Sequence, residues 1–505
     1  MYRERDFDFE QPLESNAAAR ALDLGIAPIL AAMSNGDKFL HQIADKVLNR
    51  SEEDLETIAH RQAILRDVLA NPEAATQLYA LVVEAEEGHR RHYWLGRGPS
   101  STLYGGVGLL EFFVGALRRL RRFADERAQL FSSRGLTTLF ASLQRELSDE
   151  YLDVVQAHLK QLKFKNGVLV SAQLGPGNKG INYVLRRSLK PERGWFERLF
   201  MQDPSGYTFQ LHPRDEAGAR ALGALRNRGV NLVANAVAQS ADHILSFFKL
   251  LRAELAFYIG CLNMHEKLAS IAEPMCFPVP VDARERIHAF QELYDVSLAL
   301  ASGGRVVGND LKLEGNDIVV VTGANRGGKS VFLRSIGLAQ LMMQCGMFVG
   351  AESFCANVCS GVFTHYKREE DREMKSGKFD EEIARMSEIA DRIRPNALML
   401  FNESFAATND REGSEIARQI VSALLEKHIK VFFVTHLYEF ARSLWEQKIG
   451  IPTFLRAERQ PDGTRTFKLV EARPLETSYG EDLYREIFDG KPASEPAAAQ
   501  EAGNL

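Results

Sequence analysis

The residues best suited to chemistry form one glycine-rich run that fits the pattern G-x-x-x-x-G-K-[ST]. Its members are Gly323, Ala324, Asn325, Arg326, Gly327, Gly328, Lys329 and Ser330, and Val331 follows them. In such a loop, glycines let backbone N–H groups surround phosphate oxygens, and the next helix adds a favourable dipole. We expect Lys329 to reach the β- and γ-phosphates of a nucleotide and the Ser330 hydroxyl to bind Mg²⁺. A glycine-rich turn without a ligand is disfavoured, because an apolar strand at 317–322 precedes the run and a helical segment follows it.

Two further apolar segments end in residues that could act on the same phosphates. The segment at 397–401 is followed by Asn402 and Glu403, and the segment at 430–436 ends in His436. ATPases with this kind of loop usually carry Asp and then Glu at the first place, where the Asp holds Mg²⁺ and the Glu orients water. Because Asn402 brings no charge, we expect weakened Mg²⁺ binding and slow hydrolysis.

The roles of these side chains follow from their places on the strands. His436 stands where α/β proteins bind ligands, so we predict that it senses the γ-phosphate, although a lone histidine is more often structural. Glu403, His436 and Lys329 are the predicted catalytic residues, and Ser330 and Asn402 are the predicted metal residues. The order of loop, acidic position and strand-end histidine indicates an ABC-type ATPase that uses ATP and Mg²⁺.

The amino-acid composition limits which class of protein can carry this site. The chain has 505 residues, 45% of them hydrophobic and 26% charged, which favours a soluble globular protein of two to four domains. Its formal net charge of −5 excludes a global positive field, so any contact with nucleic acid must come from local basic patches. The five cysteines do not make a disulfide framework, and neither a signal peptide nor a membrane span is expected. We therefore expect a cytoplasmic location.

The pattern along the chain predicts helices first and an α/β region second. Residues 1–36 are interpreted as a short polar leader with one helix, and residues 37–285 as a mainly helical domain. Within the latter, β-rich segments at 167–174 and 181–187 mark a small insertion near 160–215, to which residues 207–211 could add a strand. Residues 230–259 hold neither Gly nor Pro and carry an apolar stripe of helical period, which predicts a long helix.

The second half alternates strands and helices. After a Pro-rich linker at 274–282, this alternation predicts an α/β P-loop ATPase domain over residues 286–490, and a tail at 491–505 is expected to be disordered. The long helix is interpreted either as part of an extended bundle or as a lever that carries motion.

At this point the residues resemble a known family. The loop and its helix, then Phe363-Thr364 with Asp371, Phe379 and Glu382, are similar to the phosphate loop and signature region of MutS, the DNA mismatch-repair ATPase. The resemblance extends to Thr408, Asn409 and Asp410 with Gly413, to residues 434–436, and to residues 478–480. It covers about 293–488, and more loosely the helical residues 37–272, which would correspond to the core, the lever and a clamp. It implies ATP-driven homodimerisation, DNA held between lever and clamp arms, and Thr408–Asp410 as a dimer-contacting loop.

The resemblance also has departures. A signature Ser is implied to complete the partner's site in trans, yet Gly377 occupies its expected position and Ser376 precedes it, so both are candidates. Arg326 and Val331 differ from the usual loop residues. The N-terminal mismatch-reading and connector domains, the C-terminal dimerising appendage and a nuclease domain are not expected. The sequence Phe7-Asp8-Phe9-Glu10 contains the Phe-x-Glu pattern with which the family wedges beside a mispaired base, and we interpret this match as coincidence.

Contact with double-stranded or branched DNA is implied by the resemblance, and a basic cluster in the clamp region supports it. The candidate DNA-binding residues are Lys163, Lys165, Lys179, Arg186 and Arg187. They could neutralise phosphates without reading bases, and a solvated sheet surface explains the same charges. Two hypotheses therefore stay open: a structure-selective or non-specific DNA clamp in repair or recombination, and an ATP-switched dimeric scaffold that binds a protein partner.

Overall fold

The structure is a computed structural model of the chain, and it describes residues 1–2, 5–92, 98–165, 167–186, 209–367, 377–447, 452–460 and 463–474. The chain divides into two compact units. The first comprises residues 1–72, 133–135 and 253–505, and the second comprises residues 73–132 and 136–252. Residues 37–72, which the sequence pattern places with the helical region, thus belong to the same compact unit as the α/β half. The tail at 491–505 lies outside the described residues.

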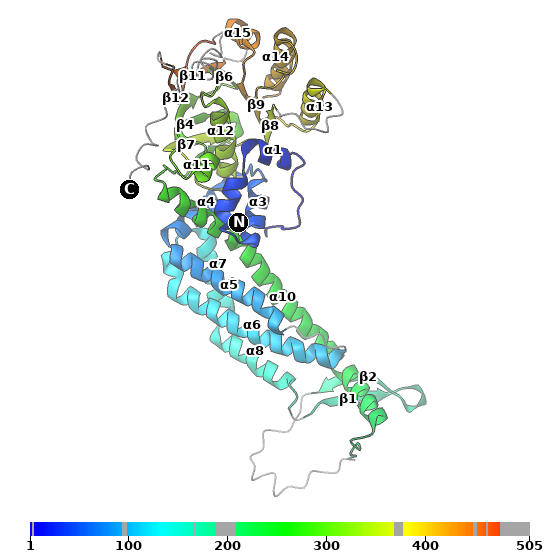
Figure 1. Ribbon diagram of the computed structural model, residues 1–505. Coiled ribbons are helices and arrows are strands. Elements are labelled where there is room, and N and C mark those ends of the chain that lie inside the picture. The colour runs from blue at the N-terminus through cyan, green and yellow to red at the C-terminus, as the bar shows by residue number, and fades with distance from the viewer. Residues whose placement is uncertain are drawn as a thin grey trace, which may run out of the picture. The chain divides into compact units, whose positions relative to one another are not determined.

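The second unit is built from long helices that lie side by side in Figure 1. Its helices are α5 (Pro72–His92), α6 (Pro99–Arg127), α7 (Arg134–Glu146), α8 (Asp149–Leu162) and the first part of α10 (Glu216–Ser270), with a 3-10 turn at Ala128–Leu130. Aromatic side chains form its core: the Phe113 and Phe248 rings stack with their centroids 5.8 Å apart, and Phe140 lies 6.0 Å from Phe123. The predicted long helix is confirmed, and it extends well beyond residues 230–259 at both ends.

A two-stranded antiparallel hairpin interrupts the helices of this unit, as the β-rich segments predict. It consists of β1 (Leu169–Leu174) and β2 (Gly180–Arg186), with a turn at Pro176–Asn178. The hairpin packs on the start of α10, where Val170 lies against Gly229 and Arg228 lies over the Tyr183 ring. The suggested extra strand is not formed in the described residues 209–211.

The first unit contains a six-stranded sheet with the order β12-β11-β6-β10-β9-β8. Its strands are β6 (Ile318–Gly323), β8 (Val362–Tyr366), β9 (Leu398–Asn402), β10 (Lys430–Val434), β11 (Thr453–Arg459) and β12 (Arg465–Glu471). All neighbours are parallel except β11 and β12. The helices of this region are α12 (Lys329–Gln344), α13 (Lys378–Ala390), α14 (Asp410–Glu426) and α15 (Tyr438–Gln447). The predicted α/β region is therefore present, and its central strands are apolar runs because helices cover a parallel sheet.

A second, four-stranded sheet has the order β3-β7-β4-β5. It is formed by β3 (Val279–Val281), β4 (His288–Leu293), β5 (Asn309–Leu313) and β7 (Ser353–Asn357), with a 3-10 turn at Ala283–Glu285. The interpretation of residues 274–282 as a linker is thus wrong in part, because Val279–Val281 form a strand. Pro280 is compatible with this strand since β3 is at the edge of the sheet, where a missing N–H costs no ladder bond.

The N-terminal residues also pack more closely than a polar leader would. They form two helices, α1 (Ala17–Leu24) and α2 (Ala27–Ser34), before α3 (Lys38–Leu48) and α4 (Leu55–Ala70), and α11 (Val296–Ser302) follows later in the chain. The expectation of one helix is therefore wrong. Arg20 is fully buried and donates to the carbonyl oxygens of Val362 and Asn49, which ties α1 to the six-stranded sheet.

By length and apolar composition alone, one described helix, Pro99–Leu130, could cross a membrane, and the bent pair α1–α2 could be a second candidate. Core helices of proteins that enter no membrane pass the same test. In the helix Pro99–Leu130, 39% of the apolar segment is buried inside the protein. This helix also carries Arg118, which pairs with Asp153.

Candidate nucleotide-binding site

The predicted phosphate loop lies at the carboxyl end of the buried strand β6 and leads directly into α12 (Figure 1). Gly323 has a φ of +107° and Gly328 a φ of +85°, conformations that side chains rarely adopt, so glycine is required at both positions. Arg326 has a φ of 57° although it is not glycine, which marks local strain in the exposed part of the loop. Gly328 is the N-cap of α12, so the loop leads straight into a helix N-terminus, whose dipole favours an anion.

Lys329 is the first residue of α12, and its side chain turns back into the loop. It is buried, and Nζ donates to the carbonyl oxygens of Gly323 and Ala324, 2.9 Å away in both cases. Burial lowers the pKa of Lys329 to about 8, while the nearby Glu403 carboxylate acts in the opposite direction and Arg465 in the same one. The charge is thus held under the loop, beside the carboxylate predicted to be catalytic.

Ser330 and Asn402, the two predicted metal residues, contact each other. The Ser330 hydroxyl donates to Oδ1 of Asn402 over 3.0 Å, which joins the start of α12 to the end of β9. Both oxygens are of the hard type that Mg²⁺ accepts, so the pair fits a divalent cation, although no carboxylate belongs to the pair. Among the described residues, no group of three or more His, Cys, Asp or Glu side chains could hold a metal.

Glu403 and His436 form a second pair at the ends of β9 and β10, which are parallel neighbours. Nε2 of His436 lies 3.0 Å from Oε1 of Glu403, and both side chains are about one-third exposed. This hydrogen bond is the main cause that lowers the pKa of Glu403, and the charges of Lys329 and Lys367 act in the same direction. The Glu403 carboxylate is therefore ionised near neutral pH and accessible to solvent. A group that accepts a proton from water must meet both conditions.

The predicted dimer-contacting loop caps the next helix. The Asn409 side chain accepts from the N–H of Glu412 over 3.0 Å, and the Thr408 hydroxyl donates to the Glu412 carboxylate over 2.7 Å. Asp410 is exposed as the first residue of α14. Gly377 is the exposed N-cap of α13, whereas Ser376 lies outside the described residues, so the trans-acting signature residue stays a prediction.

Two basic residues near the site were not predicted. Arg465, on β12, donates from Nε to the carbonyl oxygen of Asn325 over 3.3 Å, and so lies against the phosphate loop. Lys367 follows β8 and donates its backbone N–H to the carbonyl oxygen of Asn402 over 2.9 Å. Neither residue belongs to a motif. The pairing of strands distant in the sequence brings Arg465 to the phosphate loop and Lys367 to the end of β9.

The candidate DNA-binding residues lie on or beside the hairpin of the second unit. Lys165 and Lys179 are exposed, Arg186 donates to the Ser171 hydroxyl over 2.9 Å, and Lys163 pairs with Glu111 over 2.7 Å. Arg187 lies outside the described residues. The hairpin also exposes apolar side chains, with Leu174 80% exposed.

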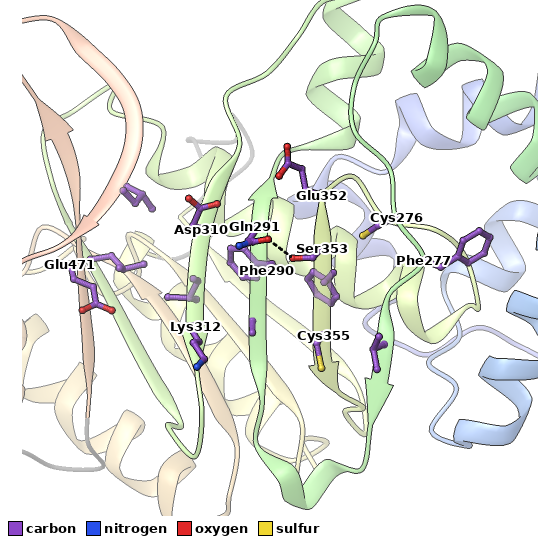
Figure 2. Close-up of a pocket in the computed structure, with 16 residues that line it drawn as sticks. Cys276, Phe277, Phe290, Gln291, Asp310, Lys312, Glu352, Ser353, Cys355 and Glu471 are labelled. Carbon is purple, nitrogen blue, oxygen red and sulfur yellow. Dashed lines mark hydrogen bonds between the residues drawn. The ribbon is translucent and has the colours of Figure 1, made fainter.

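A hollow of about 740 Å³ lies away from the phosphate loop. Figure 2 shows it beside the four-stranded sheet, where the side chains of Gln291 and Ser353 are hydrogen-bonded over 3.2 Å. Lys312 of β5 and Cys355 of β7, two strands separated by β4, also line it. No predicted nucleotide residue lines it. The chemistry suggested by the sequence therefore belongs to the strand ends of the six-stranded sheet and not to this hollow.

Comparison with known proteins matches both halves of the chain to family models. The family model of the MutS2 N-terminal domain matches residues 53–271, and that of MutS domain V matches residues 319–494. The chain is 29% identical over 245 residues to DNA mismatch repair protein MutS of Leuconostoc citreum, which covers 47% of this chain and 28% of that protein.

Two other relatives show the same partial overlap. Endonuclease MutS2 of Lactobacillus helveticus is 29% identical over 246 residues, 47% of this chain and 30% of that protein. MutS protein homolog 4 of Mus musculus is 31% identical over 134 residues, 26% of this chain and 14% of that protein. The matched region thus spans less than a third of each of these relatives. The helical region and the α/β region are both matched by MutS-type domains, and the chain belongs to the MutS family.

Proposed function

We propose that this protein is an ATPase that dimerises on binding ATP and clamps DNA, as a structure-selective or non-specific factor of DNA repair or recombination. The observation that carries the proposal is the convergence of Lys329, the Ser330–Asn402 pair and the Glu403–His436 pair at the ends of adjacent parallel strands. Ligands of α/β proteins bind at this edge of the sheet. Membership of the MutS family, whose members are ATPases, supports the same conclusion. We expect it to act in the cytoplasm.

In the proposed mechanism, each side chain has a separate task. The loop backbone and Lys329 would bind the phosphates, and Ser330 and Asn402 would hold Mg²⁺. Glu403 would orient the attacking water and accept its proton. His436 holds the carboxylate of Glu403 and senses the terminal phosphate. Bound Mg²⁺ would neutralise charge on the phosphate oxygens. Thr408–Asp410 and the region of Ser376 and Gly377 are the proposed contacts with the second copy.

Asn402→Asp should strengthen the proposed metal site, because a carboxylate binds Mg²⁺ more strongly than an amide oxygen does. We expect half-maximal ATPase activity at a Mg²⁺ concentration lowered by roughly tenfold, the equivalent of about 1.4 kcal/mol. A Mg²⁺ titration of steady-state hydrolysis measures this. Asn235→Asp adds the same charge at an exposed position of α10, in the second unit, and serves as the control. Identical titrations for the wild type and both variants would contradict the assignment of Asn402.

DNA binding is proposed to rest on phosphates and not on a mismatch wedge. Phe7 is only 5% exposed, and Lys46 lies over the Phe9 ring, so the wedge-like letters are engaged in packing. Lys165, Lys179 and Arg186, on or beside the hairpin, are exposed, and Arg186 also bonds the Ser171 hydroxyl. Each phosphate contact contributes roughly −0.9 to the slope of log K against log salt.

Reversing Lys165, Lys179 and Arg186 to Glu should weaken binding to perfect and mismatched duplexes equally. The salt slope should become flatter by about 2 to 3 if each cation contacts one phosphate. Gel-shift titrations at several salt concentrations, with and without ATP, measure both effects. A control variant reverses Arg127, Arg145 and Lys249, exposed cations of the same unit, and carries the same net charge. Equal losses in the two variants would remove the hairpin from the DNA contact.

The second candidate function is an ATP-switched dimeric scaffold that binds a protein partner. The apolar exposure of the hairpin favours it: Leu174 is 80%, Val184 44% and Ile181 41% exposed. Exposed apolar groups of this kind mark protein contacts more often than phosphate contacts. A wild-type protein that binds no duplex or branched DNA at low salt, with or without ATP, would favour the scaffold over the clamp.

A further inference from the structure

A buried histidine lies directly behind the proposed catalytic glutamate. His365 is in β8, pairs in register with Phe401 of β9, and is 0% exposed. We propose that His365 is a positioning residue, which holds the turn that carries Glu403 and ties that turn to helix α13. The proposal rests on the proposed ATPase function of this site and adds to it a residue that touches no nucleotide.

The hydrogen bonds of His365 connect three elements. Ser404, the neighbour of Glu403, donates its hydroxyl to the His365 carbonyl oxygen over 2.6 Å, and its Oγ lies 2.7 Å from Nδ1 of the ring. A neutral imidazole has one N–H, and Nε2 needs it to face a carbonyl oxygen, so Nδ1 accepts from the Ser404 hydroxyl, whose proton is shared between Nδ1 and the His365 carbonyl oxygen. On the other side of the ring, Nε2 donates to the carbonyl oxygen of Glu382 in α13 over 3.0 Å. The ring therefore spans the gap between the turn after β9 and the helix α13.

The turn needs such support, because its backbone is strained. Glu403 has a φ of 55° and Phe405 a φ of 63°, in the left-handed region that is unfavourable for residues with a side chain. The Phe405 ring is fully buried and stacks on His365, with centroids 5.3 Å apart and planes at 19°. Strain of this kind persists only where the surroundings hold it.

Glu382 completes the connection from the side of α13. It is buried, and its carboxylate accepts from the backbone N–H groups of Phe405 and Ala407, which favour its charged form, although burial is the larger effect and raises its pKa. The strained turn is thus bonded to α13 through both the ring of His365 and the carboxylate of Glu382.

The link through His365 connects the Glu403 turn to a helix, α13, that begins at a predicted dimer contact. Gly377, at the N-cap of α13, is one of the two candidate signature residues. A shift of α13 would therefore move the carbonyl oxygen that His365 bonds, and with it the backbone that directs the Glu403 carboxylate. Losing the link should misplace Glu403 without removing a phosphate contact, since Lys329 and Ser330 stand on α12.

The experiment compares two buried histidines of the same unit. H365Q removes the ring link. H288Q removes a ring of the four-stranded sheet that is 1% exposed and packs against the aromatic side chains Phe290, Phe354 and Phe432. We expect H365Q to lower kcat for ATP hydrolysis by roughly 100-fold, the effect of a misplacement of about 1 Å, with KM within about twofold of the wild-type value. H288Q should leave kcat unchanged at temperatures where it is folded.

S404A, a milder change, should also lower kcat. The kcat of the double variant H365Q/S404A should be no lower than that of H365Q alone, because the two residues act through one link.

Hydrogen exchange of residues 401–412 without nucleotide gives a second readout. The turn amides should exchange at least about tenfold faster in H365Q than in H288Q or the wild type, because losing one hydrogen bond lowers the opening free energy by about 1.4 kcal/mol or more. Unchanged exchange, or a wild-type kcat in folded H365Q, overturns the positioning role while leaving the ATPase proposal intact. Absence of ATP binding by the wild-type protein overturns the ATPase proposal instead, and the exchange result then decides the structural link by itself.

Discussion

Lys329→Ala should abolish ATP binding at micromolar nucleotide while the protein stays folded. Lys329 is the buried cation of the phosphate loop, and its Nζ now bonds only two loop carbonyl oxygens. Truncating a buried charged side chain that pairs with a charged ligand lowers the binding free energy by about 2–5 kcal/mol. This corresponds to a loss of affinity of roughly 30-fold to several thousand-fold. Titration with a fluorescent ATP analogue measures the dissociation constant.

The control for this prediction is Lys312→Ala, which removes a lysine that is 77% exposed in the same unit and remote from the loop. Thermal unfolding of both variants separates a lost phosphate contact from a lost fold, because two loop carbonyl oxygens lose their donor in Lys329→Ala. Unchanged affinity in a folded Lys329→Ala protein would show that the loop does not bind nucleotide.

Glu403→Gln should trap the ATP-bound dimer. Glutamine keeps the oxygen that bonds Nε2 of His436, so the geometry at the ends of β9 and β10 is retained. It cannot accept a proton from water, and loss of such a group slows hydrolysis by about 100-fold to 10,000-fold. Because the terminal phosphate then persists, ATP and Mg²⁺ should convert the protein to a species of twice 56.6 kDa, as measured by light scattering.

Glu415→Gln is the matched control, since Glu415 lies on α14 in an exposed pair with Arg418. It should hydrolyse ATP at the wild-type rate and return to the monomer. A Glu403→Gln protein that hydrolyses normally would exclude Glu403 as the residue that activates water. One that binds ATP without hydrolysis and yet stays monomeric would instead separate nucleotide binding from dimerisation.

Local pattern was sufficient for the parts of this protein that are contiguous in the chain. The strand, glycine-rich loop and helix around Lys329 are neighbours in sequence, and their apolar period and glycines require the observed turn. The long helix around residues 230–259 was predictable for the same reason, because a periodic apolar stripe without Gly or Pro favours a helix whatever surrounds it. The hairpin strands and the α/β alternation follow from similar short-range signals.

The misjudged segments are those whose structure depends on a neighbour distant in the chain. Val279–Val281 became a strand because β7 offered a partner edge, which outweighed the prolines around it. The N-terminal residues pack because Arg20 donates to a carbonyl oxygen more than three hundred residues away, that of Val362. Propensity carries no information about such partners, since their stabilisation arises only after the chain has folded.

The sequence by itself therefore determined the family, the phosphate loop and the residue types at the ends of β9 and β10. Only the tertiary structure decided that Ser330 bonds Asn402, that Arg465 lies against the loop, and that His365 supports the turn behind Glu403. The physical reason is that a motif records bonds between near neighbours, whereas parallel strands bring together side chains that are separated by whole helices. Hydrogen bonds across those strands depend on register and burial, and both are properties of the packed sheet.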